Sequence, residues 1–101
     1  MALSSKERAA LRGEAHHLTA LVHVGHQGIT AAIQQSLDDA LRTRELVKIQ
    51  FTRTADVDLK VAAGELADAV GAEVIQVIGR TVTLYRLNPD LKLKTDVPPW
   101  R

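Results

Sequence analysis

The residues of this sequence best suited to chemistry form a Gly-x-x-Gly segment, Gly25-His26-Gln27-Gly28, which follows an apolar run and precedes residues with helical spacing. Glycine has no Cβ, so the backbone can bend tightly there and another backbone can approach it closely. Thr30 suits a helix N-cap, and a helix N-terminus offers unpaired N–H groups and a positive dipole end to a phosphate. We therefore hypothesise that this loop holds a nucleic-acid backbone, although an isolated Gly-x-x-Gly is also ordinary turn chemistry.

Other reactive residues give weaker signals. The candidates for a metal site are four histidines: His16, His17, His23 and His26. His23 and His26 have a plausible ligand spacing, but no cysteine or nearby carboxylate completes the set. The chain also lacks the Gly-x-Ser-x-Gly, His-Glu-x-x-His and phosphate-loop motifs. We therefore predict no catalytic site, no metal and no cofactor, and the protein is not expected to be an enzyme.

The composition is that of one globular domain. The chain has 101 residues, of which 46% are hydrophobic and 25% charged, enough for a single modest core. Thirteen Lys and Arg residues nearly balance twelve Asp and Glu, for a net charge of +1. This balance argues against nucleic-acid binding by bulk charge, so that such a function would require the basic residues to gather on one face.

The composition also limits the cellular setting. Cysteine is absent, which excludes disulfides, thiolate zinc sites and cysteine nucleophiles and is compatible with a reducing compartment. The N-terminal residues have no apolar stretch of signal-peptide length, and no segment approaches the roughly 18 to 20 apolar residues of a membrane span. We expect a cytoplasmic protein that makes no membrane contact and is a monomer.

Periodicity and capping residues predict seven elements that position the loop. A capping box of Ser4 and Glu7 begins the first helix, and Gly71 is expected to end the third. The predicted order is a helix from Ser5 to Gly13, a strand over Leu21–Val24, a helix after Thr30 that ends near Arg42 to Arg44, a strand over Glu45–Thr52, a helix whose cap residues come from Ala55-Asp56-Val57-Asp58, and a hairpin of Val74–Ile78 and Thr81–Tyr85. The proline-containing segment 88–101 is expected to be an extended tail beyond a domain of residues 1–87.

The hairpin has the clearest local pattern. A two-residue Gly79-Arg80 loop suits a type II′ turn, because glycine tolerates the positive φ of the first turn position. The predicted register places Val77 opposite Val82, Ile75 opposite Leu84, Gln76 opposite Thr83 and Val74 opposite Tyr85. One face of the hairpin is then apolar and packs on helices, and the other is partly open.

This order predicts an α/β fold, a compact α-β-α-β-α-β-β two-layer sandwich with a four-stranded sheet. The crossovers through the second and third helices should place both helices on one face of the sheet.

If the loop holds phosphate, basic residues from other elements can add contacts. The candidate RNA-binding residues are Gly25, His26, Gln27, Gly28 and Thr30 at the loop and Lys6, Arg8, Arg12, Lys48, Arg80 and Arg86 elsewhere. Phosphate contacts position a nucleic acid without reading its sequence. Stacking should be limited, because Phe51 is expected in the core and Tyr85 is the one aromatic side chain expected on the sheet surface. We therefore expect recognition of RNA shape and backbone.

Several blocks, taken in order, resemble the YhbY-type or CRM-domain RNA-binding proteins, where CRM stands for chloroplast RNA splicing and ribosome maturation. The blocks are Leu11-Arg12-Gly13 with Ala15-His16 and Leu18, then Val24-Gly25-His26-Gln27-Gly28-Ile29-Thr30, Glu45-Leu46-Val47-Lys48, Gly71 with Val77-Ile78-Gly79, and Leu84-Tyr85-Arg86. The match spans roughly Leu3 to Arg86 and leaves the tail uncovered.

The resemblance implies a mixed four-stranded sheet similar to the C-terminal domain of translation initiation factor three. It also implies that the loop is similar to the backbone-clamping loop of KH domains, and that the partner is large-subunit ribosomal RNA or a pre-ribosomal particle. Arg12, Lys48 and Arg86 fall where the family pattern places basic residues. Members often carry a cation at the loop tip, whereas His26 and Gln27 are neutral or partly charged near pH 7. The loop is therefore expected to set position more than affinity.

Two other classes of function remain open from the sequence. One is a protein-interaction adaptor that uses the open sheet face and the Pro-Pro-Trp tail. The other, disfavoured by the motif search, is a small hydrolase or metal enzyme. The layout of charge separates the first from RNA binding, since RNA contact favours basic residues that share a surface.

Overall fold

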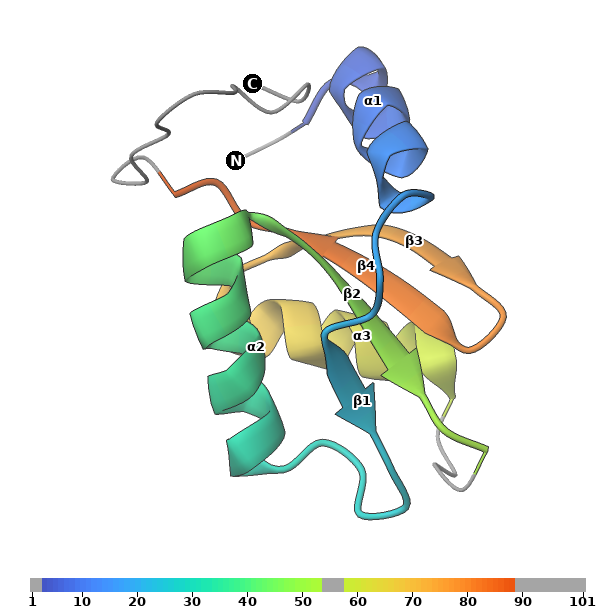
Figure 1. Ribbon diagram of the computed structural model, residues 1–101, viewed down its shortest axis with the longest axis vertical. Coiled ribbons are helices and arrows are strands. Elements are labelled where there is room, and N and C mark those ends of the chain that lie inside the picture. Colours follow the sequence, from blue (N-terminus) through green and yellow to red (C-terminus); the bar gives the residue numbers. More distant parts are fainter. Residues whose placement is uncertain (1–2, 54–57, 89–101) are drawn as a thin grey trace.

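The computed structural model describes residues 3–53 and 58–88, and most of the predicted tail and the expected cap residues Ala55 to Val57 lie outside them. The elements follow the predicted order (Figure 1). They are α1 (Ser5–Ala15), β1 (Val22–Val24), α2 (Ala31–Arg44), β2 (Leu46–Phe51), α3 (Leu59–Val70), β3 (Glu73–Ile78) and β4 (Thr81–Tyr85). None of these helices is long and apolar enough to cross a membrane, as far as the described residues extend.

The helices begin at the residues that the sequence indicates. Side-chain oxygens of Ser4, Thr30 and Asp58 accept hydrogen bonds from amides of the first turns of α1, α2 and α3. α1 continues two residues past the predicted end at Gly13, because Leu11 and Ala15 are both buried and their packing holds the last turn. Capping therefore sets where the helices start, and burial extends the first one.

The capping box of α1 is sensitive to pH. The Glu7 carboxylate accepts the Ser4 amide at 3.0 Å, and this backbone hydrogen bond, followed by the one with the Ser4 side chain, lowers the pKa of Glu7. Because the pKa of Glu7 is lower in the folded than in the unfolded state, the ionised carboxylate stabilises the helix at pH values above the unfolded-state pKa. This stabilisation is lost as the pH falls through the folded-state pKa. We expect the start of α1 to fray in acid, and Glu7→Gln to remove this transition. Amide NMR shifts of Ser4 followed across the carboxylate range test this, and an unchanged titration in the variant would contradict it.

The sheet is four-stranded and mixed, in the order β1-β2-β4-β3. β1 and β2 are parallel, and β4 lies antiparallel between β2 and β3. The crossovers α2 and α3 cover one face of this sheet, as expected for short connections. The predicted α/β architecture, with both crossover helices on one side, is confirmed.

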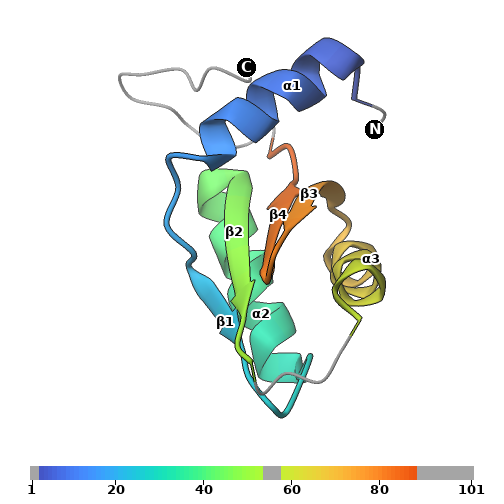
Figure 2. The same cartoon turned by 90° about the vertical axis from the view of Figure 1, so that its right-hand side faces the viewer.

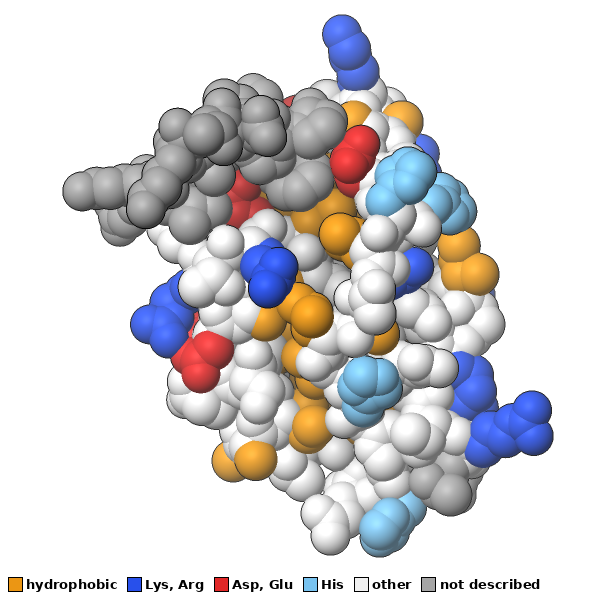
Figure 3. Space-filling model, in the orientation of Figure 1, with side chains coloured by type: hydrophobic (Ala, Val, Ile, Leu, Met, Phe, Trp, Pro, Cys, Tyr) orange, Lys and Arg blue, Asp and Glu red, His pale blue; other side chains and the backbone are white. Residues whose placement is uncertain are grey.

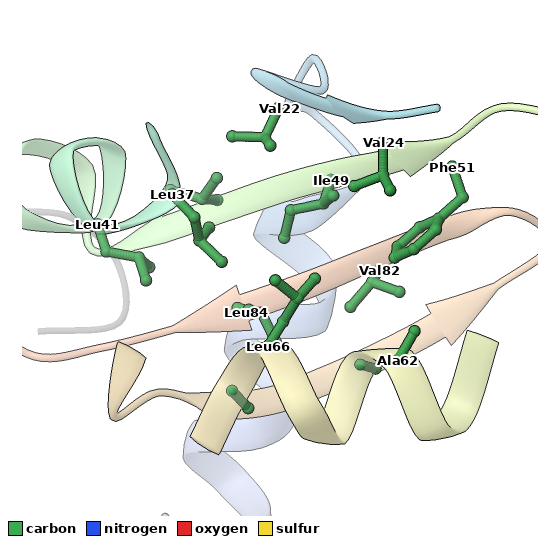
Figure 4. Packing of buried hydrophobic residues seen from close by; sticks show 13 residues of the cluster. Val22, Val24, Leu37, Leu41, Ile49, Phe51, Ala62, Leu66, Val82 and Leu84 are labelled. Carbon is green, nitrogen blue, oxygen red and sulfur yellow. The ribbon is translucent and has the colours of Figure 1, made fainter. Parts of the chain in front are cut away.

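The core lies between these two helices and the sheet (Figure 4). Leu37 and Leu41 of α2 and Leu66 of α3 point toward side chains that alternate along the strands, among them Ile49 and Val82. All five are fully buried. The apolar stripes of the helices and the alternation in β2 are therefore confirmed as one core.

α1 packs across one end of the opposite face of the sheet (Figure 2). There Leu11 meets Leu46, Ile75 and Tyr85 in a second apolar cluster. Tyr85 is 4% exposed, so the prediction that it is presented on the sheet surface is wrong. Burial under α1 is the cause, because an aromatic ring gains more from that contact than from remaining in water.

The hairpin follows the predicted register near its turn and departs from it beyond a bulge. Val77 pairs with Val82 and Gln76 with Thr83, as predicted, and Gly79 has φ +58°. The register then shifts by one, so that Leu84 faces Val74 and Tyr85 faces Glu73. The predicted pairs of Ile75 with Leu84 and Val74 with Tyr85 are wrong, because a β-bulge turns Ile75 toward the cluster under α1.

Candidate nucleic-acid interface

The Gly-x-x-Gly segment forms a closed turn at the end of β1. The Gly28 amide donates to the Gly25 carbonyl at 2.9 Å, which places exposed His26 and Gln27 at the tip. Neither tip residue has a positive φ, so both occupy the turn without strain. Gly28 has φ +72°, a conformation that L side chains adopt rarely, and a Cβ added at either glycine would meet open space. The loop is thus a hydrogen-bonded turn whose glycines leave room beside the backbone.

A groove of about 380 Å³ separates this loop from the first turns of α2. It is lined by Gly25, His26, Gln27, Gly28, Thr30, Ala32, Ile33 and Ser36, and none of these described lining residues is acidic. The Thr30 hydroxyl accepts the Ile33 amide at 3.2 Å, whereas the amides of Ala31 and Ala32 precede the first intrahelical hydrogen bond. The groove combines free space, helix amides that have no hydrogen-bond partner among the described residues, and the apolar side chains of Ala32 and Ile33. It suits one phosphate and its sugar.

Two arginines lie at the same end of the sheet as the loop. Arg80 donates from Nε to the Phe51 carbonyl at 3.2 Å and from Nη2 to the Thr52 carbonyl at 2.6 Å. The Thr52 amide in turn donates to the Val24 carbonyl, which joins the end of β2 to the end of β1. The exposed Arg53 follows directly. The sequence prediction included Arg80 but not Arg53. The parallel pairing of β1 with β2 brings the ends of these two strands together, and this pairing was the signal that could have identified Arg53.

Comparison with known proteins gives the family. The family model described as CRS1 / YhbY (CRM) domain matches residues 3–86. The chain belongs to the CRM-domain family. A relative from Bacillus subtilis, "Probable RNA-binding protein YqeI", is 31% identical over 89% of this chain and 94% of its own. The "RNA-binding protein" of Haemophilus influenzae is 28% identical to this chain, and the match covers 91% of this chain and 93% of that protein.

The CRM-domain fold is also seen in a solved structure. The solution structure of the hypothetical protein SAV1595 from Staphylococcus aureus superposes with a TM-score of 0.77 and 32% sequence identity. The match covers 90% of this chain and 95% of that one. The expected family and fold are therefore confirmed.

The other predicted cations of this CRM domain lie away from the loop. Lys6 and Arg12 are exposed on α1, which crosses the far end of the sheet (Figure 1). Arg8 donates to the Val74 carbonyl at 3.1 Å and to the Glu73 carboxylate at 3.0 Å, and so fastens α1 to β3. Of these three residues, Lys6 and Arg12 are exposed, and Arg8 is only partly exposed because its guanidinium is held against β3.

Arg86 and Lys48 lie on opposite faces of the sheet. Arg86 donates to the Asp38 carboxylate and to the Val70 carbonyl, on the face covered by α2 and α3. Lys48 points to the other face, where Nζ lies 3.4 Å from the Leu18 carbonyl. On the face of the molecule drawn in Figure 3, the Lys and Arg side chains are dispersed and form no single patch. The six predicted basic residues do not share one surface. The layout of charge therefore does not favour RNA binding over a protein-interaction adaptor, and the case for RNA has to come from the loop, its groove and the family.

The histidines do not form a metal centre in the part of the chain that the structure describes, where no group of three or more His, Cys, Asp or Glu residues is placed to hold an ion. His26 lies at the loop tip and His23 in β1. The structure thus leaves the loop and its groove as the site with the best-defined geometry.

Proposed function

We propose that this protein binds RNA and that the groove beside the Gly25–Gly28 turn holds the RNA backbone. The observation that carries the proposal is the groove itself, which combines an open glycine turn with the unpaired amides at the start of α2. Membership in the CRM-domain family supports it, since relatives bear the name of RNA-binding proteins.

The binding mode follows from the side chains at this end of the sheet. Backbone amides and the exposed Arg53 contact phosphates, which positions the RNA without reading its bases. Arg80 donates from Nε and Nη2 to the Phe51 and Thr52 carbonyls and adds positive charge beside them. Phe51 and Tyr85 are buried and offer no stacking surface. Recognition therefore depends on the shape and backbone of a structured RNA.

The proposed partner is precursor RNA of the large ribosomal subunit during ribosome assembly in the cytoplasm. This step rests on the resemblance of the ordered sequence blocks to YhbY-type proteins, stand-alone members of which associate with such precursors. In this role the chain acts by binding alone, as a monomer, without catalysis.

A pair of charge variants at the loop tip tests the proposal. Gln27 is exposed and has an ordinary φ, so Gln27→Lys and Gln27→Glu alter charge and leave the turn intact. We expect Gln27→Lys to tighten and Gln27→Glu to weaken the binding of a structured ribosomal RNA fragment. Each added phosphate contact should steepen the slope of log K against log salt by about one.

The measurement is a fluorescence titration of both variants and wild type at two salt concentrations. Lys60→Gln, an exposed site on α3, is the control for a change of one charge. Equal affinities of the Lys and Glu variants would show that no phosphate lies near the loop tip.

A further inference from the structure

A row of polar side chains crosses the sheet on the face opposite the main core. The strand register places Lys48 of β2 beside Thr83 of β4, and Thr83 beside Gln76 of β3. The same row borders His16, the C-cap residue of α1. These four residues, with Ile78 and Thr81, line a hollow of about 160 Å³. The hollow is separate from the loop groove, with which it shares no lining residue.

Two polar groups in this hollow lack the partners that their burial requires. Thr83 is 1% exposed, and its Oγ1 has no hydrogen-bond partner among the residues that the structure describes. Lys48 is half-buried, forms no ion pair with any described residue, and makes one long hydrogen bond of 3.4 Å to the Leu18 carbonyl. Buried hydroxyls are hydrogen-bonded in most proteins, and a half-buried ammonium is costly without an anion.

The chemistry of the lining selects the kind of ligand. Among the described residues around the hollow there is one Lys, one His, one Gln and two Thr, and there is no carboxylate. An anion that accepts hydrogen bonds satisfies both the Lys48 ammonium and the Thr83 hydroxyl, whereas a cation is repelled by Lys48 and an apolar group satisfies neither.

We propose that this hollow is a second RNA contact that binds one backbone phosphate, a step that rests on the proposed RNA-binding function. Lys48 supplies the charge, and Thr83 and Gln76 donate to the phosphate oxygens. Because Thr83 Oγ1 has almost no free surface, the flanking Lys48 and Gln76 side chains turn aside as the phosphate enters.

The next row of the sheet connects the hollow with the loop end. His23 of β1 pairs with Gln50 of β2, which pairs with Thr81 of β4, and the first two are exposed. Phe51, where β2 ends beside the loop, lies three residue steps beyond Lys48, about 10 Å at the usual strand rise. One RNA strand can therefore contact both sites over a polar surface.

The test is an amide NMR titration of the whole chain with a short structured fragment of ribosomal RNA, followed at two sets of reporters. The loop set is Gly25 to Gly28, and the hollow set is Lys48, Gln76 and Thr83. We expect both sets to shift in wild type, Gly28→Asp to lose the loop shifts alone, and Lys48→Met or Thr83→Val to lose the hollow shifts alone. Lys60→Met, on the other side of the sheet, controls for loss of one lysine charge.

The outcomes separate this proposal from the function on which it rests. Loop shifts without hollow shifts in wild type overturn the second contact and leave RNA binding intact; no shift in either set overturns both. Thr83→Val should not lower the melting temperature, because the hydroxyl has no partner to lose, so missing hollow shifts in that variant do not reflect unfolding. In a last titration, inorganic phosphate replaces the RNA at the same concentration of phosphate groups. Hollow shifts as large as those with the RNA fragment would identify a free-anion site and overturn the RNA assignment.

Discussion

Gly28→Asp is expected to weaken binding of a structured ribosomal RNA by at least about tenfold, or roughly 1.4 kcal/mol. The variant adds a carboxylate to the wall of a groove whose described lining has no acidic residue. A negative charge beside a bound phosphate is repelled, and the added side chain occupies space that the RNA backbone needs. Titration at low salt, where the repulsion is least screened, should show the largest loss.

The sequence offers a matched control at Gly71. Gly71 has φ +67°, close to the +72° of Gly28, and a Cβ at either position meets open space within the fold. Gly71→Asp therefore imposes a similar backbone strain and the same change of charge, but at the C-cap of α3. We expect this variant to bind RNA as wild type does. If both variants lose affinity equally, general charge or strain explains the effect and the loop has no particular role.

The parts of the fold that depend on local chemistry were predictable from the sequence. A capping side chain acts within three residues of its own position, so Ser4, Thr30 and Asp58 marked the helix starts correctly. The alternation in β2 and the glycine turn at Gly79 acted over similarly short distances. Their agreement with one another is what fixed the order of elements.

The features that depend on distant packing were not predictable. The bulge at Ile75 has no local signature, since its cause is the apolar cluster that α1 forms with Leu46 and Tyr85. Nothing in the periodicity of α1 indicates on which face of the sheet it packs. Two incorrect predictions, the register beyond Gln76 and the exposure of Tyr85, follow from this one contact.

In the candidate site, too, the feature that depends on local chemistry was predictable from the sequence and the features that depend on distant packing were not. The glycine spacing predicted the turn, because φ at Gly28 is a local requirement. The roles of the cations were hidden, because an arginine in a sequence does not reveal whether its guanidinium meets water or a carbonyl. Arg8 and Arg86 join elements of the fold, whereas Arg53 reaches the loop end through parallel strand pairing.

Arg86 connects three elements of the core. Its Nη1 donates to Asp38 Oδ1 at 2.7 Å and to the Val70 carbonyl at 2.8 Å, and its Nη2 donates to the Asp38 carbonyl at 3.1 Å. The side chain is 20% exposed. The guanidinium thus ties the end of β4 to α2 and to the last turn of α3, where a cation also favours the helix C-terminus.

Arg86→Met is expected to lower the free energy of unfolding by about 2 to 3 kcal/mol, because it removes charge-assisted hydrogen bonds and leaves the Val70 carbonyl without this donor. Urea denaturation measures the loss. Arg42→Met is the control. Arg42 Nε lies 3.8 Å from Oδ2 of the same Asp38, but the Arg42 side chain is 61% exposed, so its removal should lower the free energy of unfolding by no more than about 1 kcal/mol. Equal losses in the two variants would contradict a structural role particular to Arg86.

The same variant separates structure from RNA contact. Arg86 falls where the family pattern places a basic residue and was predicted to bind RNA, yet its donors face Asp38 and Val70. We therefore expect Arg86→Met to bind RNA with wild-type affinity at a temperature where it remains folded. Arg86→Lys should restore little stability, because one ammonium cannot reproduce the planar fork that reaches two helices. A folded Arg86→Met protein that has lost RNA affinity would instead place the guanidinium on the RNA, and the requirement for basic residue 86 would then be functional.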